Sequence, residues 1–98
     1  MADVSIAPEA RIDLREIRRY SEQTFGRAAT EVYVEGLRSA FQRAFDRPSA
    51  GKPEFDLWPD MRSVGYRSHR IYYRPLDNGV LIVRVMHHAR DIRLAFDT

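Results

Sequence analysis

The spacing of apolar residues changes from a helical to a strand period near residue 60. Residues 8–45 repeat apolar positions every three or four residues, as in Ala10, Leu14 and Ile17, which is typical of amphipathic helices. Residues 61–88 instead alternate apolar and polar side chains in runs rich in Val, Ile and Tyr, which is typical of strands. The pattern therefore predicts helices followed by a sheet.

The helical part divides into two helices at Phe25-Gly26. Proline suits the first position of a helix, so the first helix is expected from Pro8 to about Thr24. The second is expected from Arg27 to Phe45, and small residues in its apolar stripe would let the two helices approach closely. A short strand at residues 3–7 precedes them. The predicted unit is an αα-hairpin.

Three strands are expected after the helices. The first spans residues 61–66, and a β-hairpin follows whose turn is Asp77-Asn78-Gly79, because Asn-Gly accepts the positive φ that tight turns require. The Pro- and Gly-rich segment 47–60 predicts a loop without a helix or long strand. Its Phe55, Leu57 and Trp58 should fold over the edge of the core, with a partner-facing Trp58 as the alternative.

A strand period of two separates the side chains of the hairpin into two faces. One face is expected to pack on the helices and the other to carry arginines, namely Arg70, Arg74 and Arg84. The predicted core between helices and sheet contains Leu14, Ile17, Leu37, Phe41, Ile71, Leu81, Val83 and Val85.

The order βααβββ predicts an α+β fold in which an antiparallel-type sheet packs against the helical hairpin. A chain of 98 residues is expected to form a single domain, residues 1–98. The absence of cysteine excludes disulfides, zinc-thiolate sites and thiol nucleophiles. Without a signal sequence or an apolar run of about 18 residues, we expect a cytoplasmic protein that does not interact with a membrane.

Charge is unevenly distributed along the chain. The net charge is +2, but residues 62–98 carry seven arginines against three aspartates, whereas residues 1–61 are slightly acidic. Fifteen of the sixteen basic residues are arginine, which pairs bidentately with carboxylates and phosphates and stacks on aromatic rings. The strand region is therefore suited to an anionic partner.

The chain resembles the ParE/RelE superfamily of bacterial toxins over essentially its whole length. The similarity lies in EARIDLREIRRY in the first helix, A-x3-Y-x3-L in the second, a P-x2-G loop, RIYYR in one strand and the ending IVRVMHHARD. This implies a type II toxin–antitoxin module of the plasmid stabilisation type, in which a labile antitoxin holds a stable toxin inactive and the free toxin arrests growth.

Two activities divide that superfamily. RelE-like members cut mRNA on the ribosome, which requires an acid–base pair and cations; here Arg62, Arg67, His87 and His88 would have to serve. The lone lysine, Lys52, falls in the predicted loop, and the three C-terminal strands carry no carboxylate, so that catalytic set is incomplete. The resemblance therefore favours a ParE-like inhibitor of DNA gyrase with no catalytic residues, and a RelE-like endoribonuclease is the alternative.

The expected partner is a ParD-like antitoxin in a hetero-oligomer, bound beside the αα-hairpin and at the sheet edge through apolar anchors and acidic residues. His87 and His88 are strand neighbours expected to point to opposite faces, His87 towards the core, so neither a metal nor any cofactor is expected. The residues predicted to bind the antitoxin or the target are Trp58, Arg67, Arg70, Tyr72, Arg74, Arg84, His88 and Arg90.

A plain nucleic-acid-binding module is a third interpretation. The basic face and aromatic residues would suit it, but the sequence has no helix-turn-helix signature, no RNA-binding aromatic motif and no zinc motif. Direct nucleic-acid binding therefore stays open. A neighbouring gene for a DNA-binding antitoxin would favour the toxin, and its absence would favour the module.

Overall fold

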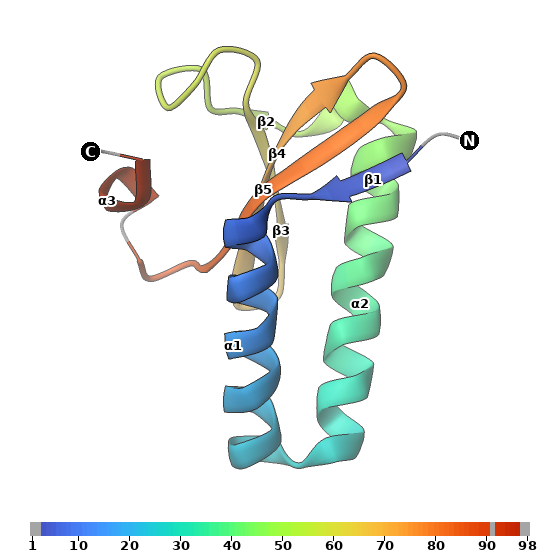
Figure 1. Cartoon of the computed structure of the whole chain (residues 1–98), viewed down its shortest axis with the longest axis vertical. Helices are drawn as coiled ribbons and strands as arrows, with labels where there is room; N and C mark the ends of the chain where they lie inside the picture. Colours follow the sequence, from blue (N-terminus) through green and yellow to red (C-terminus); the bar gives the residue numbers. More distant parts are fainter. Residues whose placement is uncertain (1–2, 91, 97–98) are drawn as a thin grey trace.

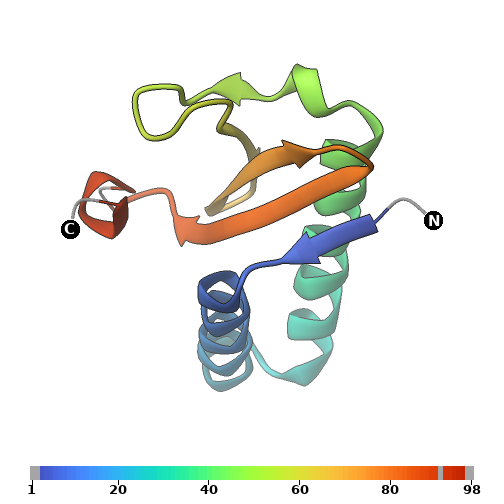
Figure 2. The same cartoon turned by 45° about the horizontal axis from the view of Figure 1, so that its top comes forward.

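The computed structural model describes residues 3–90 and 92–96, and places two long helices against one face of a five-stranded sheet (Figures 1 and 2). The strand order is β1-β5-β4-β3-β2, with β1 parallel to β5 and the other pairs antiparallel. The predicted α+β arrangement is confirmed, with a mixed sheet. The elements are β1 (Asp3–Ile6), α1 (Pro8–Phe25), α2 (Arg27–Asp46), η1 (Pro48–Ala50), β2 (Lys52–Pro53), β3 (Arg62–Tyr66), β4 (His69–Leu76), β5 (Gly79–His87) and α3 (Ile92–Phe96).

The β4–β5 hairpin forms where it was predicted, but its glycine has a different role. Leu76 pairs with Gly79, so Asp77 and Asn78 make the turn, and neither they nor Gly79 has a positive φ. Gly79 instead lies opposite Asp3 of β1, where an added Cβ would be 2.1 Å from the Asp3 carbonyl oxygen. The missing side chain thus lets β1 join the sheet.

Replacing Gly79 by alanine should therefore destabilise the protein by about 1–3 kcal/mol, because the methyl group meets backbone that cannot rotate away. The measurement is the free energy of unfolding in urea, with Asn78→Ala in the same turn as the control. Equal unfolding midpoints for the two variants would contradict this account of Gly79.

A β-bulge in β5 changes which side chains face the helices. Tyr72 pairs with Arg84 and Tyr73 with Ile82, so Val83 is the extra residue, and the alternation of faces is interrupted there. Leu37, Phe41, Ile71 and Val85 are buried in the helix-facing core, as predicted, and Leu14 and Ile17 pack against it. The prediction was wrong for Val83, which packs on the opposite face, and for Leu81, which is only half-buried; Val80 and Ile82 take their places.

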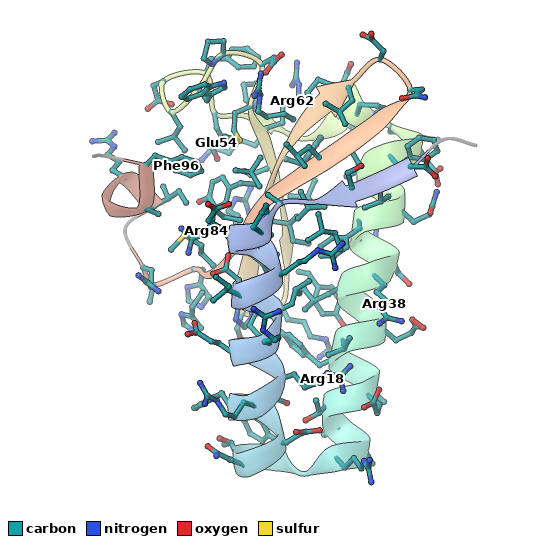
Figure 3. The ribbon with its side chains drawn as sticks, in the orientation of Figure 1. Arg18, Arg38, Glu54, Arg62, Arg84 and Phe96 are labelled. Carbon is teal, nitrogen blue, oxygen red and sulfur yellow. The ribbon has the colours of Figure 1, made fainter. Side chains whose placement is uncertain are left out.

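A second apolar cluster covers part of the sheet face opposite the long helices. Its buried members are Met61, Tyr72 and Met86. The short α3 packs on them, with the ring of Phe96 (labelled in Figure 3) 6.5 Å from that of Tyr72. The predicted return of the loop to the core holds for Leu57, which joins this cluster, whereas Phe55 and Trp58 are about half exposed.

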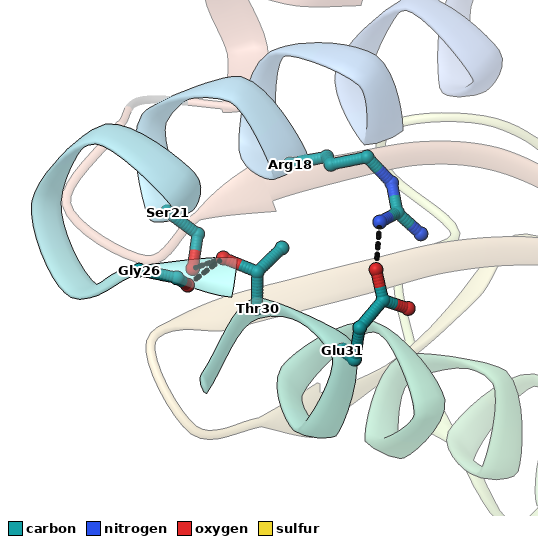
Figure 4. Close-up of polar contacts among 5 residues, drawn as sticks. All are labelled: Arg18, Ser21, Gly26, Thr30 and Glu31. Carbon is teal, nitrogen blue, oxygen red and sulfur yellow. Dashed lines mark hydrogen bonds and ion pairs between the residues drawn. The ribbon is translucent and has the colours of Figure 1, made fainter. Parts of the chain in front are cut away.

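The helical hairpin is joined by polar contacts near its tip (Figure 4). The helical conformation is interrupted between the two helices at Gly26, whose φ of 90° favours glycine. The hydroxyl of buried Thr30 lies 2.8 Å from both the Ser21 hydroxyl and the Gly26 carbonyl, and Arg18 pairs with Glu31 at 2.6 Å. These contacts hold the helices together where they extend beyond the sheet (Figure 1).

Candidate functional site

A groove lies between the outer half of the helical hairpin and the ends of β4 and β5. It has a volume of about 850 Å³. It forms because the apolar stripe of both helices continues past the last residues of the sheet, so that nothing in the described chain covers it. The helical walls are lined by Ile17, Tyr20, Phe25, Ala29, Val32 and Tyr33.

The groove exposes large apolar side chains that a folded protein normally buries. Tyr20, Phe25 and Val32 have exposed fractions of 64%, 66% and 68%, and the rings of Tyr20 and Phe25 pack edge to face at 6.5 Å. A contiguous apolar surface rimmed by polar residues is typical of a site for another protein. The groove therefore has the character of a protein-binding surface.

A buried ion pair fixes α1 to the sheet beside this groove. β1 stops pairing with β5 at Ile82, and the carboxylate of Asp13 then accepts the Val85 N–H at 2.9 Å. The same carboxylate accepts two hydrogen bonds from Arg84, at 2.8 and 2.9 Å, and these raise the pKa of the guanidinium. Arg84 lies beside the first turns of α1 in Figure 3. It is therefore an internal partner of Asp13, and its guanidinium is engaged within the fold rather than free on the sheet face.

The end of the groove contains a group of histidines. His69 pairs with His87 across β4 and β5, their rings are 5.6 Å apart, and the His88 ring stacks on that of His87 at 4.5 Å. The prediction that His87 and His88 point to opposite faces was wrong, because the strand ends at His87 and the chain turns. His87 is exposed rather than packed in the core, and Ala89 N–H donates to its Nδ1.

His69 is the member of this group that the sequence did not single out. It is half-buried, and its Nδ1 lies 2.7 Å from the hydroxyl of Tyr33. Burial, reinforced by the neighbouring His87, lowers the pKa of His69. Arg67 and Arg90 line the same end of the groove. Counting pairs from the turn without the bulge would place His69 opposite Met86, so the bulge at Val83 is what brings it beside His87.

The opposite sheet face carries a second set of the predicted residues. Arg70 donates to Ser63 Oγ, which donates to Glu54 at 2.7 Å, and burial followed by the nearby Glu54 raises the pKa of Tyr72. Arg74 pairs with Asp60, and its guanidinium lies 5.6 Å from the centre of the Trp58 ring. Glu54 is a carboxylate that the sequence did not assign to this face, because it reaches the strands from the loop.

The four residues named for the nuclease alternative are not gathered at one point. Arg67, His87 and His88 lie at the groove end, whereas Arg62 pairs with Tyr73, four residues along β4 from His69. At about 3.3 Å per residue this is a separation of about 13 Å. Arg62 is also engaged locally, donating to the Gly51 carbonyl at 2.9 Å and lying over the Phe55 ring.

Residues 3–90 and 92–96 also lack two other kinds of site. These residues contain no group of three or more His, Asp or Glu side chains placed to hold a metal ion. None of the helices within the same ranges combines the length and the apolar character of a membrane span.

Known proteins share both the fold and the sequence pattern. One chain of the chromosomal ParDE TA system from P. aeruginosa superposes with a TM-score of 0.74 over 89% of this chain and 96% of that chain, at 16% identity. Toxin ParE1 of Caulobacter vibrioides is 29% identical over 93 residues, covering 95% of this chain and 96% of the relative. Toxin ParE1 of Mycobacterium tuberculosis H37Rv is 30% identical over 88 residues, covering 89% and 90%.

A family model described as the ParE toxin of the type II toxin-antitoxin system parDE matches residues 4–92. A match of this extent confirms the resemblance and defines the class of protein as a toxin of the ParE/RelE superfamily. Within that class, the chain belongs to the ParE family of parDE type II toxin–antitoxin systems.

Proposed function

We propose that this toxin inhibits DNA gyrase without cutting nucleic acid, and that a ParD-like antitoxin neutralises it in the cytoplasm. The observation that supports a noncatalytic mode is the separation of Arg62 from His87 and His88, since acid–base cleavage needs its groups within hydrogen-bond reach of one substrate. Membership of the ParE family supports gyrase rather than the ribosome as the target.

The antitoxin is proposed to dock in the groove beside the helical hairpin, forming a hetero-oligomer. The groove offers apolar walls to an amphipathic helix, and Arg67, His88 and Arg90 at its end suit carboxylates that follow the helix. Tyr20 and Phe25 are the proposed aromatic anchors, because exposed rings of this size supply most of the energy of an interface.

The opposite sheet face is proposed to meet the target. Trp58, Arg70, Tyr72 and Arg74 lie there, on the other side of the sheet from the long helices. Both arginines already have internal partners, Ser63 for Arg70 and Asp60 for Arg74, so this face has little uncompensated charge, and an extended nucleic-acid footprint is not expected of it. Arg84 is removed from the proposed contact residues because it is bound to Asp13.

One observation favours the nuclease alternative. Glu54, Ser63 and Arg70 form a hydrogen-bonded chain beside Tyr72, which places a carboxylate and a cation on the face where the strands themselves supply no acid. This set lacks a histidine, so it could cut RNA only with Glu54 or Tyr72 as base.

Expression of the toxin in cells without antitoxin separates the two functions. Gyrase poisoning breaks DNA, so we expect induction of the DNA-damage response while protein synthesis continues at first. A variant with Glu54→Gln should be as toxic as the wild type. Immediate arrest of translation without a DNA-damage response, abolished by Glu54→Gln, would support the nuclease instead.

A further inference from the structure

Four side chains that are cationic or can become so line one end of the groove, and a fifth, His88, stacks on one of them. Arg67 comes from the turn between β3 and β4, His69 begins β4, His87 ends β5, and His88 and Arg90 follow it. The pairing of His69 with His87 and the hydrogen bond from His88 N–H to the Ser68 carbonyl hold the two chain segments together. We call these five residues the histidine end of the groove.

The titratable groups that face this end come from every neighbouring element. Helix α1 contributes Asp13 and Glu16, α2 contributes Tyr33, and the end of β3 contributes Tyr66. Asp13 is already occupied by Arg84 and the Val85 N–H, and Glu16 is a solvent-exposed residue of the α1 wall. Protonation of the histidines would therefore add positive charge to a region whose nearest buried carboxylate is engaged elsewhere.

Tyr33 lets His69 hold either protonation state without losing a hydrogen bond. A tyrosine hydroxyl can donate to Nδ1 of a neutral imidazole and can accept from Nδ1–H of a protonated one. Burial raises the pKa of Tyr33, so its hydroxyl keeps its proton across the range in which histidine titrates.

Arg67 has a left-handed backbone conformation in the turn between β3 and β4. Its φ of 49° is unfavourable for a residue with a Cβ and is readily adopted only by glycine. Arg67 donates to the hydroxyl of Tyr66 at 3.2 Å, and its guanidinium lies 5.7 Å from the centre of that ring. The guanidinium is thereby held at the histidine end.

We propose that the histidine end is a pH-dependent carboxylate-binding subsite, which holds an acidic segment of the antitoxin more tightly as the pH falls from 8 to 6. This inference rests on the proposed docking of the antitoxin in the groove. In the free toxin, burial lowers the pKa of His69 and so disfavours its charge. A bound carboxylate favours the charged form and raises that pKa, and by linkage the affinity rises as protons are taken up, by at most about tenfold for each unit of pKa rise.

The test uses the full chain and an N-acetylated, C-amidated peptide of four glutamates, whose carboxylates are ionised at both pH values. Its dissociation constant is measured by calorimetry at pH 6.0 and 8.0 in low salt. We expect the peptide to bind about threefold or more tighter at pH 6.0 than at pH 8.0, and equally tightly at both pH values in the variant His69→Gln/His87→Gln/His88→Gln. If the variant kept the wild-type ratio of the two dissociation constants, the proposal would be overturned. Equal affinity of the wild type at both pH values would overturn it too.

Proton NMR of the wild type provides the second measurement, which does not depend on the variant folding. The peptide should raise the titration midpoint of the His69 ring protons, and a midpoint that stays constant would also overturn the proposal. Gyrase inhibition is assayed on the same preparation. Loss of the pH dependence with gyrase inhibition intact would refute the subsite alone, whereas pH-dependent binding without gyrase inhibition would refute the proposed function and leave the subsite.

Discussion

Replacing Tyr20 and Phe25 together by alanine is expected to weaken antitoxin binding by about 100-fold or more while leaving the fold intact. Both rings line the groove and are largely exposed in the free toxin, so their removal creates no cavity in the core. If they anchor the antitoxin, each truncation should cost about 2 kcal/mol or more of binding free energy, as aromatic hot spots do. The dissociation constant of the purified pair measures this directly.

Ile12 and Leu76 provide a matched control. They are exposed to 47% and 45% and lie outside the groove. The double variant Ile12→Ala/Leu76→Ala removes two apolar side chains from elsewhere on the surface, so it should bind antitoxin with unchanged affinity. A similar loss in both double variants, or none in either, would place the antitoxin outside the groove.

Replacing Asp13 by alanine is expected to destabilise the protein by about 3–5 kcal/mol. The substitution leaves the partly buried Arg84 without its counter-ion and the Val85 N–H without an acceptor, and unpaired buried groups of this kind are costly. Exposed Glu22 on the same helix is the control, since its truncation should change stability by about 0.5 kcal/mol or less. Urea denaturation measures both.

The double variant Asp13→Leu/Arg84→Met distinguishes the loss of the ion pair from the effect of leaving Arg84 unpaired. Two apolar side chains of similar size should restore much of the stability lost in Asp13→Ala, because replacing both members of a buried ion pair is often neutral. If the double variant is as unstable as the single one, the hydrogen bond to Val85 rather than the unpaired charge accounts for the loss.

The order of the main elements could be predicted because each is determined by local sequence, whereas η1 and β2 in the predicted loop and α3 after the hairpin were not predicted. Pro8 begins the first helix, Gly26 separates the helices, and the alternating residues of the hairpin form two strands. The faces of β5 could not be predicted, because one inserted residue at Val83 reverses the alternation beyond it and no local signal marks the bulge. The partner of Gly79 could not be predicted either, since β1 lies more than seventy residues away in sequence.

The candidate site could be predicted as a set of residues but not as a geometry. The arginines and histidines of the strand region were identified, yet the fold distributes them over a groove end, an opposite sheet face and a buried pair. Asp13 looks like any polar residue of an amphipathic helix, and only the end of β1 pairing reveals why β5 needs its carboxylate. Long-range pairing therefore decides which charges are available to partners.

Purified toxin, freed of antitoxin and mixed with gyrase and relaxed plasmid, tests the central claim most directly. A parallel reaction contains ribosomes programmed with mRNA, and both use wild-type toxin and the variant His87→Ala/His88→Ala, which removes the two imidazoles named as acid and base for the nuclease alternative. We expect both toxins to inhibit supercoiling or trap cleaved DNA and to leave the mRNA intact. Cleavage of mRNA in the ribosomal A site by the wild type alone, with gyrase unaffected, would contradict the proposed function.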